Sequence, residues 1–246
     1  MKIFGLGDLH LSLCQAVLPG EWNNLKLHKP MNVFGEQWQN HIERIYRGWI
    51  NRVTSEDVVL VPGDISWAMR MEDVGFDLDF LSLLPGKIIM IQGNHDYWWQ
   101  SISKVRQALP KNIHAIQNDG VLVGDIYIAG TRGWVCPGST GFNQHDKKIY
   151  QRELNRLTLS LQSIDPRAKK VIAMFHFMPC NDLHEKSGFI DLMEEYGVEH
   201  CVYGHLHQGA FHLRLPEIKW GIRFSLVSGD YLNFQPLLLE AEVHKS

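Results

Sequence analysis

Residues 88–96 read IIMIQGNHD, and this stretch decides the fold of the chain. Four apolar residues in a row, three of them isoleucine, are typical of a buried β-strand. Gly93 closes the run, and Asn94, His95 and Asp96 follow it directly. In an open α/β sheet the carboxyl ends of the strands line the binding crevice. The stretch therefore indicates an α/β protein with polar, chemically active side chains at one edge of its sheet.

Four further segments repeat this arrangement. The apolar runs 2–6, 58–61, 171–175 and 201–203 are also expected to be buried strands. Each is followed by possible metal ligands, which are Asp8 and His10, Asp64, His176, and His205 and His207. Taken singly, an Asp-x-His, a Gly-Asp or a lone His is explained as well by a turn or by core packing. Five such coincidences in one chain favour a dinuclear metal hydrolase, and oxygen and nitrogen donors without cysteine suit Mn, Fe or Zn.

The order of these motifs resembles that of the calcineurin-like metallophosphoesterase superfamily, and the matching blocks run from Asp8 to His207. The resemblance implies an α/β fold with four αββα layers, in which two mixed β-sheets are flanked by helices. Many members carry a second Asp shortly after Gly-Asp, whereas Ile65 to Trp67 follow Asp64 here. Many also carry paired histidines in the fourth block, whereas phenylalanines flank His176. Neither departure removes an expected ligand.

The resemblance also implies a role for each residue. A first metal ion would be held by Asp8, His10 and His207. A second would be held by Asn94, His176 and His205, with Asp64 bridging the two ions. His95 would stay unligated and protonate the leaving group, and Asp96 would orient its ring. Such a centre, with two divalent ions of Mn, Fe or Zn, would hydrolyse a P–O bond by attack of a metal-bound hydroxide.

The remaining pattern agrees with this fold class. Apolar residues at helical spacing predict helices over 37–53, 71–84, 150–164 and 187–196. Short strands are expected over 121–123, 127–129, 222–227 and 237–239. Because no repeat or linker divides the sequence, we expect residues 1–246 to form a single domain.

For three segments near the motifs, the sequence allows two roles each. The connection 11–35 is expected to be either a lid or binding loop, or a surface excursion that covers apolar residues. The aromatic run at 97–99 either stacks on a leaving group or belongs to the core. Arg132, at the end of an apolar run, either holds a substrate phosphate through its guanidinium or is a solvated surface residue.

Composition narrows the class of substrate. The chain has 246 residues, 45% of them apolar, and a net charge of −3, which argues against nucleic acid or an anionic membrane as partner. The start of the sequence has no signal peptide pattern and no apolar run long enough to span a membrane, so a cytoplasmic location is expected. We expect a small soluble phosphate ester as substrate, either a monoester or a diester. The alternatives are a nuclease of the same superfamily and a non-catalytic binding module that keeps the fold. The oligomeric state is left open.

Overall fold

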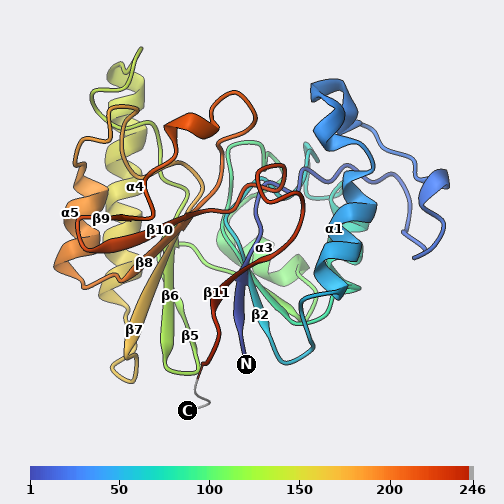
Figure 1. The fold of residues 1–246 in the computed structure, drawn as a ribbon, viewed down its shortest axis with the longest axis horizontal. Coiled ribbons are helices and arrows are strands. Elements are labelled where there is room, and N and C mark those ends of the chain that lie inside the picture. The colour runs from blue at the N-terminus through green and yellow to red at the C-terminus, as the bar shows by residue number, and fades with distance from the viewer. Residues whose placement is uncertain (244–246) are drawn as a thin grey trace.

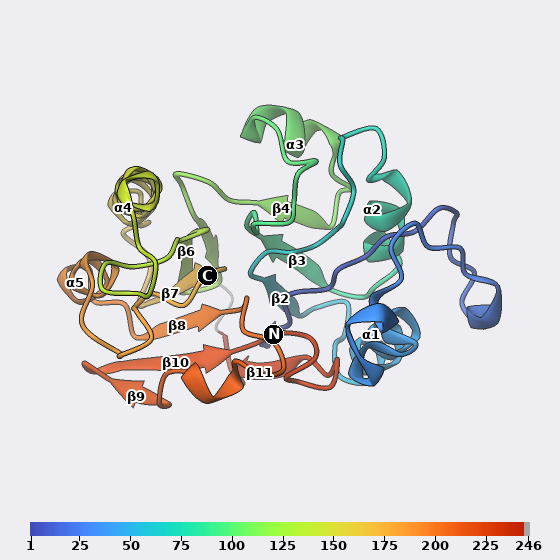
Figure 2. The same ribbon diagram turned by 90° about the horizontal axis from the view of Figure 1, so that it is seen from above.

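The computed structural model describes residues 1–243, and its central feature is a pair of β-sheets packed face to face (Figures 1 and 2). The first sheet has the strand order β11-β1-β2-β3-β4. Its strands are β1 (Ile3–Gly5), β2 (Val58–Val61), β3 (Lys87–Met90), β4 (Ile113–Ala115) and β11 (Leu237–Glu240). Strands β1 to β4 are parallel, and β11 runs antiparallel to β1, so the sheet is mixed.

The second sheet has the order β5-β6-β7-β8-β10-β9. Its strands are β5 (Val121–Val123), β6 (Ile126–Thr131), β7 (Lys170–Phe175), β8 (His200–Tyr203), β9 (Ile218–Lys219) and β10 (Ile222–Leu226). The four inner strands are parallel, and the two edge strands are antiparallel to their neighbours. This sheet is therefore mixed as well.

Helices cover the outer face of each sheet (Figure 2). The first sheet is covered by α1 (His41–Ile50), α2 (Gly75–Ser82) and α3 (Ile102–Ala108), and the second by α4 (Gln144–Gln162) and α5 (Gly188–Glu195). Short 3-10 helices are η1 (Trp22–Asn24), η2 (Met31–Phe34), η3 (Glu36–Trp38) and η4 (Phe211–Leu213). The expected four-layer αββα sandwich is confirmed. In the part of the chain described, no helix is both long and apolar enough to cross a membrane.

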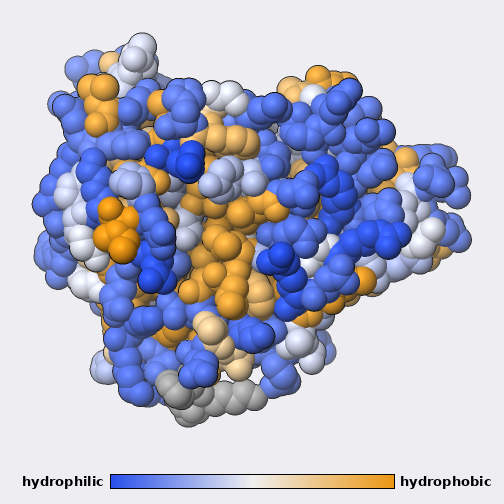
Figure 3. Space-filling model, in the orientation of Figure 1, coloured by the Kyte–Doolittle hydropathy of each residue, from blue (hydrophilic) through white to orange (hydrophobic). Residues whose placement is uncertain are grey.

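Strands β1, β2 and β6 are buried along their whole length, because both faces of each sheet are covered. In β2, Val58 and Leu60 belong to the core between the sheets, whereas Val59 and Val61 belong to the core under the helices. In the view of Figure 3, apolar residues also gather at the middle of the face, between β10 and β11.

Most expected elements are present with shifted ends. The helix expected over 37–53 is shorter, because 36–38 forms η3 and Asn40, with φ of 53°, precedes α1. Helix α4 begins earlier than expected, because the Asn143 and Asp146 side chains form a capping box at its start. Helix α3 and strand β4 were not predicted, and they complete the far edge of the first sheet.

Candidate metal centre

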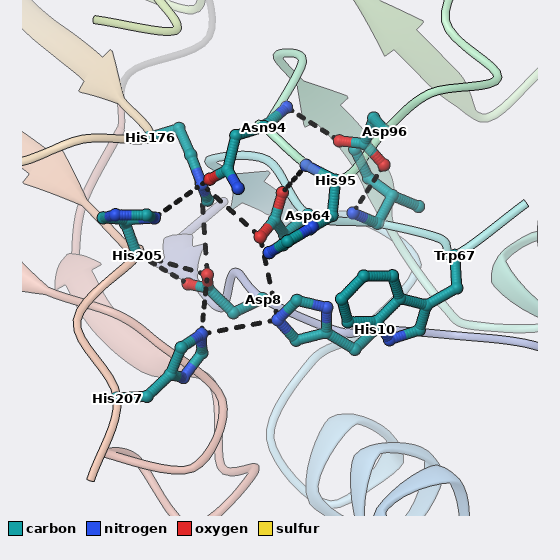
Figure 4. Close-up of polar contacts among 12 residues, drawn as sticks. Asp8, His10, Asp64, Trp67, Asn94, His95, Asp96, His176, His205 and His207 are labelled. Atoms are coloured by element: carbon teal, nitrogen blue, oxygen red, sulfur yellow. Dashed lines mark hydrogen bonds and ion pairs between the residues drawn. The ribbon is translucent and has the colours of Figure 1, made fainter. Parts of the chain in front are cut away.

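The residues expected to bind metal converge at the carboxyl ends of five parallel strands (Figure 4). Asp8 and His10 follow β1, Asp64 follows β2, and Asn94 follows β3. From the second sheet, His176 follows β7, and His205 and His207 follow β8. The two sheets thus supply opposite sides of one site.

One group of donor atoms contains the residues expected at the first metal ion. The Nε2 atoms of His10 and His207 are 3.4 Å apart, and Nε2 of His207 is 3.6 Å from Oδ1 of Asp8. One donor atom from each of these three residues lies within 4.8 Å of the other two. The three side chains could therefore hold a single ion.

A second group contains the residues expected at the second ion. Nε2 of His176 lies 2.6 Å from Oδ1 of Asn94 and 3.2 Å from Nδ1 of His205. The donor atoms of Asp8, Asp64 and His176 also lie within 4.8 Å of one another. Asp8 therefore stands between the two groups, in addition to its expected place in the first.

Asp64 has the geometry of a bridge. Its Oδ2 atom is 3.7 Å from Nε2 of His10, in the first group, and 3.5 Å from Nε2 of His176, in the second. Oδ2 is buried and has no hydrogen-bond partner in the described structure, whereas Oδ1 accepts a bond of 2.8 Å from the His95 amide. A buried carboxylate oxygen without a partner is costly, so this atom is suited to a cation.

The protonation pattern of the ring nitrogens also fits a cation. Nδ1 of His176 donates to the Pro62 carbonyl at 3.0 Å, so in the neutral ring Nε2 carries only a lone pair. That lone pair faces the amide oxygen of Asn94, which is also an acceptor. In the neutral ring, Nδ1 of His207 likewise donates to Asp230 at 2.9 Å and leaves the Nε2 lone pair for a cation. Acceptors that face one another without a proton between them repel, and a divalent cation would turn this repulsion into coordination.

Burial shapes the charges at the site. It lowers the pKa of His176 and of His205 to about 3, which keeps both rings neutral, as metal ligation requires. Burial raises the pKa of Asp8, and the charge of His207 opposes it. For His207 itself, burial acts downward, but the hydrogen bond to Asp230 and the charge of Asp8 outweigh it and raise the pKa to about 9.

The backbone is strained at four of the expected ligands. Asp8, His10, Asp64 and His205 have φ values of 53°, 46°, 51° and 68°, in the left-handed region that non-glycine residues avoid. Such conformations cost about 1–3 kcal/mol each and persist where the surroundings enforce them. Here all four residues lie in the loops that follow the carboxyl ends of β1, β2 and β8.

At two glycines of the motifs, no larger residue would fit. A Cβ atom at Gly204 would lie 2.3 Å from Oδ2 of Asp8, and one at Gly93 would lie 2.2 Å from Oδ1 of Asp64. Both distances are far below van der Waals contact. Only glycine lets these loops approach the carboxylates so closely.

Asp96 does not have the contact expected of it. Its carboxylate accepts bonds of 2.7–3.0 Å from the amides of Ile65, Ser66 and Gly93 and from the Trp98 indole. The ring of His95 is not among its partners, and Nδ1 of that ring has none in the described structure. Asp96 therefore joins the loops after β2 and β3, and the His95 ring packs against Trp67 with centroids 4.3 Å apart.

Arg132 is not the solvated surface residue of the alternative, since its side chain is only 14% exposed. Its guanidinium lies 3.5 Å from the buried carboxylate of Glu153 and over the Trp134 ring at 4.8 Å. The Arg132 carbonyl also accepts the amides of His176 and Phe177, which fixes the end of β7. Binding of a substrate phosphate by Arg132 stays a prediction.

Sequence reasoning missed Asp230, Trp67 and Lys29. Asp230 fixes the His207 ring and also accepts the Gln208 amide at 3.1 Å. The sequence does contain a pattern that could have indicated it, because Gly229 and Asp230 follow β10 as Gly63 and Asp64 follow β2.

The aromatic run 97–99 is divided between the two expected roles. Trp98 and Trp99 are core residues, whereas Tyr97 is 55% exposed beside the site.

Comparison with known proteins identifies the family of the chain. No curated protein sequence matches the chain. Among solved structures, a phosphopantetheinyl hydrolase from Mycobacterium tuberculosis superposes with a TM-score of 0.53 at 13% identity, covering 98% of this chain and 96% of that one. A protein of unknown function from Aquifex aeolicus has a TM-score of 0.49 at 12% identity, covering 96% and 95%. The family model of the calcineurin-like phosphoesterases matches residues 1–209, and the chain belongs to that family.

Proposed function

We propose that the protein is a dinuclear metal-dependent phosphohydrolase acting on a small phosphate monoester or diester. One ion would be held by Asp8, His10 and His207, and the other by Asn94, His176 and His205. The observation that carries this proposal is the position of Asp64. Its buried, unpartnered Oδ2 atom lies 3.7 Å from a donor of the first group and 3.5 Å from a donor of the second.

Two bound divalent cations would polarise the phosphoryl oxygens and lower the pKa of water in the site. The chain supplies the remaining chemistry. His95 lines the cavity beside the ligands and has no role as a ligand, so its ring is free to donate a proton to the leaving oxygen. Burial lowers the pKa of His95, and the Asp64 carboxylate opposes that effect. An anionic substrate beside the ring would act in the same direction as Asp64 and favour the protonated form.

The donor set supports Mn, Fe or Zn as the ions, since it offers imidazole, carboxylate and amide groups and no thiolate. It also supports a catalytic protein over a binding module, because every expected ligand is present. We further infer that the described chain acts as one domain, since the site takes ligands from both sheets.

The proposal is tested by loading the protein with Mn, Fe or Zn and measuring metal content and turnover of p-nitrophenyl phosphate and its bis ester. Asp64→Ala should lose more metal than His10→Ala, because the bridge contacts both ions, and activity should fall to background. Asp182→Ala, at an exposed position outside the site, is the matched control. An Asp64→Ala protein that keeps two equivalents of metal and full turnover would contradict the dinuclear assignment. Preferential cleavage of DNA would favour the nuclease instead.

A further inference from the structure

A cavity of about 710 Å³ opens directly beside the candidate metal centre. His10, His95 and His207 lie on one side of it, and its other walls are largely apolar. Two of the wall residues, Phe34 and Tyr97, are 51% and 55% exposed. Large apolar side chains that remain exposed around a pocket are typical of a binding site.

The cavity contains an ordered stack of rings. Trp67 stacks on His10 with centroids 4.9 Å apart and planes inclined by 22° (Figure 4). The Phe34 ring is also stacked on Trp67, with the two centroids 6.4 Å apart and the planes inclined by only 13°. The stack therefore leads from a proposed metal ligand outward into the cavity.

A single cation lies against this stack. The Lys29 ammonium is 3.0 Å from the Trp67 centroid and 5.7 Å from the Phe34 centroid. Within the described residues, no carboxylate lies within 4.0 Å of this ammonium. Burial lowers the Lys29 pKa. The ammonium is thus held by ring faces and is available for an anion from outside the chain.

The wall that carries Lys29 is held in place. The Lys29 carbonyl accepts a hydrogen bond from the Ser12 hydroxyl at 2.9 Å. The His28 amide donates to the Ser12 carbonyl, and the Cys14 amide donates to the Lys26 carbonyl. These bonds pair residues 12–14 with 26–28. The connection 11–35, for which the sequence left two roles open, therefore builds one side of the cavity.

We propose that this cavity takes the leaving group of the substrate, and that this group is a flat apolar unit bearing an anionic substituent. The inference rests on the proposed function. Phe34 and Trp67 would contact the flat unit, and Lys29 would pair with the anion. His95 lines this cavity together with the proposed ligands His10 and His207, so its ring is within the site where the leaving oxygen of such a substrate would need a proton.

The test compares ethyl, benzyl and 4-carboxybenzyl phosphate on the metal-loaded protein. Their leaving groups are all alkoxides that require protonation, so ratios of kcat/KM isolate the contribution of the cavity. We expect benzyl to exceed ethyl phosphate by about tenfold, and Phe34→Ala to remove most of that preference. Lys29→Met should lower the ratio of carboxybenzyl to benzyl phosphate by a similar factor. Phe76→Ala, at an exposed phenylalanine of α2 outside the cavity, is the matched control and should leave both ratios unchanged.

Calorimetric binding of benzylphosphonate and ethylphosphonate gives a readout without turnover. Equal turnover of the three esters, with ratios that Phe34→Ala does not change, would overturn the inference and leave the hydrolase proposal standing. If no ester is cleaved but benzylphosphonate binds tighter than ethylphosphonate in a Phe34-dependent manner, the cavity binds an apolar ring, but its role as a leaving-group site fails together with the hydrolase proposal. Absence of both turnover and selective binding would refute both.

Discussion

Asp230 controls the proton on His207, so its replacement by asparagine should weaken the first metal position. The carboxylate is fully buried and uses both oxygens, one for Nδ1 of His207 at 2.9 Å and one for the Gln208 amide at 3.1 Å. An asparagine has one acceptor and cannot satisfy both donors. If its oxygen stays with the Gln208 amide, its NH2 group faces Nδ1 and forces the ring proton onto Nε2.

That proton would occupy the atom that must bind the ion. Nε2 of His207 lies 3.4 Å from Nε2 of His10 and 3.6 Å from Asp8, in the centre of the first donor group. Loss of a partner that orients a ligating histidine costs about 10- to 100-fold in metal affinity, or about 1.4–2.7 kcal/mol. We expect Asp230→Asn to show a loss in this range, confined to one of the two equivalents of metal.

Competition with a chromophoric chelator measures this loss, and the rise in Tm on adding metal measures it independently. Asp182→Asn, at an exposed aspartate outside the site, controls for the change of charge. Affinity within twofold of the parent, together with an unchanged Tm response, would refute the argument that Asp230 sets the tautomer of His207.

Three further outcomes are expected. His95→Ala should keep both metal ions and lose kcat, more for alkyl phosphates than for p-nitrophenyl phosphate, whose leaving group needs little protonation. Equal losses on both would argue against an acid role. Arg132→Ala should lower kcat/KM by about 10- to 150-fold and weaken inhibition by inorganic phosphate if the guanidinium binds the phosphoryl group. Arg156→Ala removes another partner of Glu153 and is the control, which should change neither kcat/KM nor phosphate inhibition. The metal-free protein should lose stability as the pH rises from 6.5 through about 9, because folding raises the His207 pKa over that interval and the stabilising proton is lost. Thermal unfolding measured in the presence of a chelator should show Tm falling across this range. The Tm of the metal-loaded protein should not fall.

The positions of the expected ligands could be predicted because strand ends place them by simple rules. An apolar run followed by Gly-Asp or Gly-Asn-His specifies both a buried strand and the polar residues at its carboxyl end. Parallel neighbours then bring Asp64 and Asn94 together without any information on side-chain packing. The convergence of the two sheets was implied by the family resemblance, since no local pattern shows that the end of β8 faces the end of β1.

The contacts of Asp96 were beyond this reasoning. A residue next to His95 in sequence is easily assigned to its ring, but the turn after β3 directs the carboxylate at three backbone amides instead. Backbone donors exposed at a loop are everywhere in the chain and carry no sequence signal. The same holds for Lys29, whose position over Trp67 depends on the pairing of 12–14 with 26–28.

Strain and electrostatics at the centre point to one requirement. Four expected ligands adopt left-handed backbone conformations, and two glycines permit contacts that any side chain would block. The same residues place the buried, unpartnered Oδ2 atom of Asp64 within 4 Å of Nε2 of His10 and of Nε2 of His176. Packing alone would favour separating these groups, since each loses hydration and gains no partner. The proposed pair of cations would offset both costs, so we expect removal of bound metal to loosen the five loops together rather than the loop of Asp64 alone.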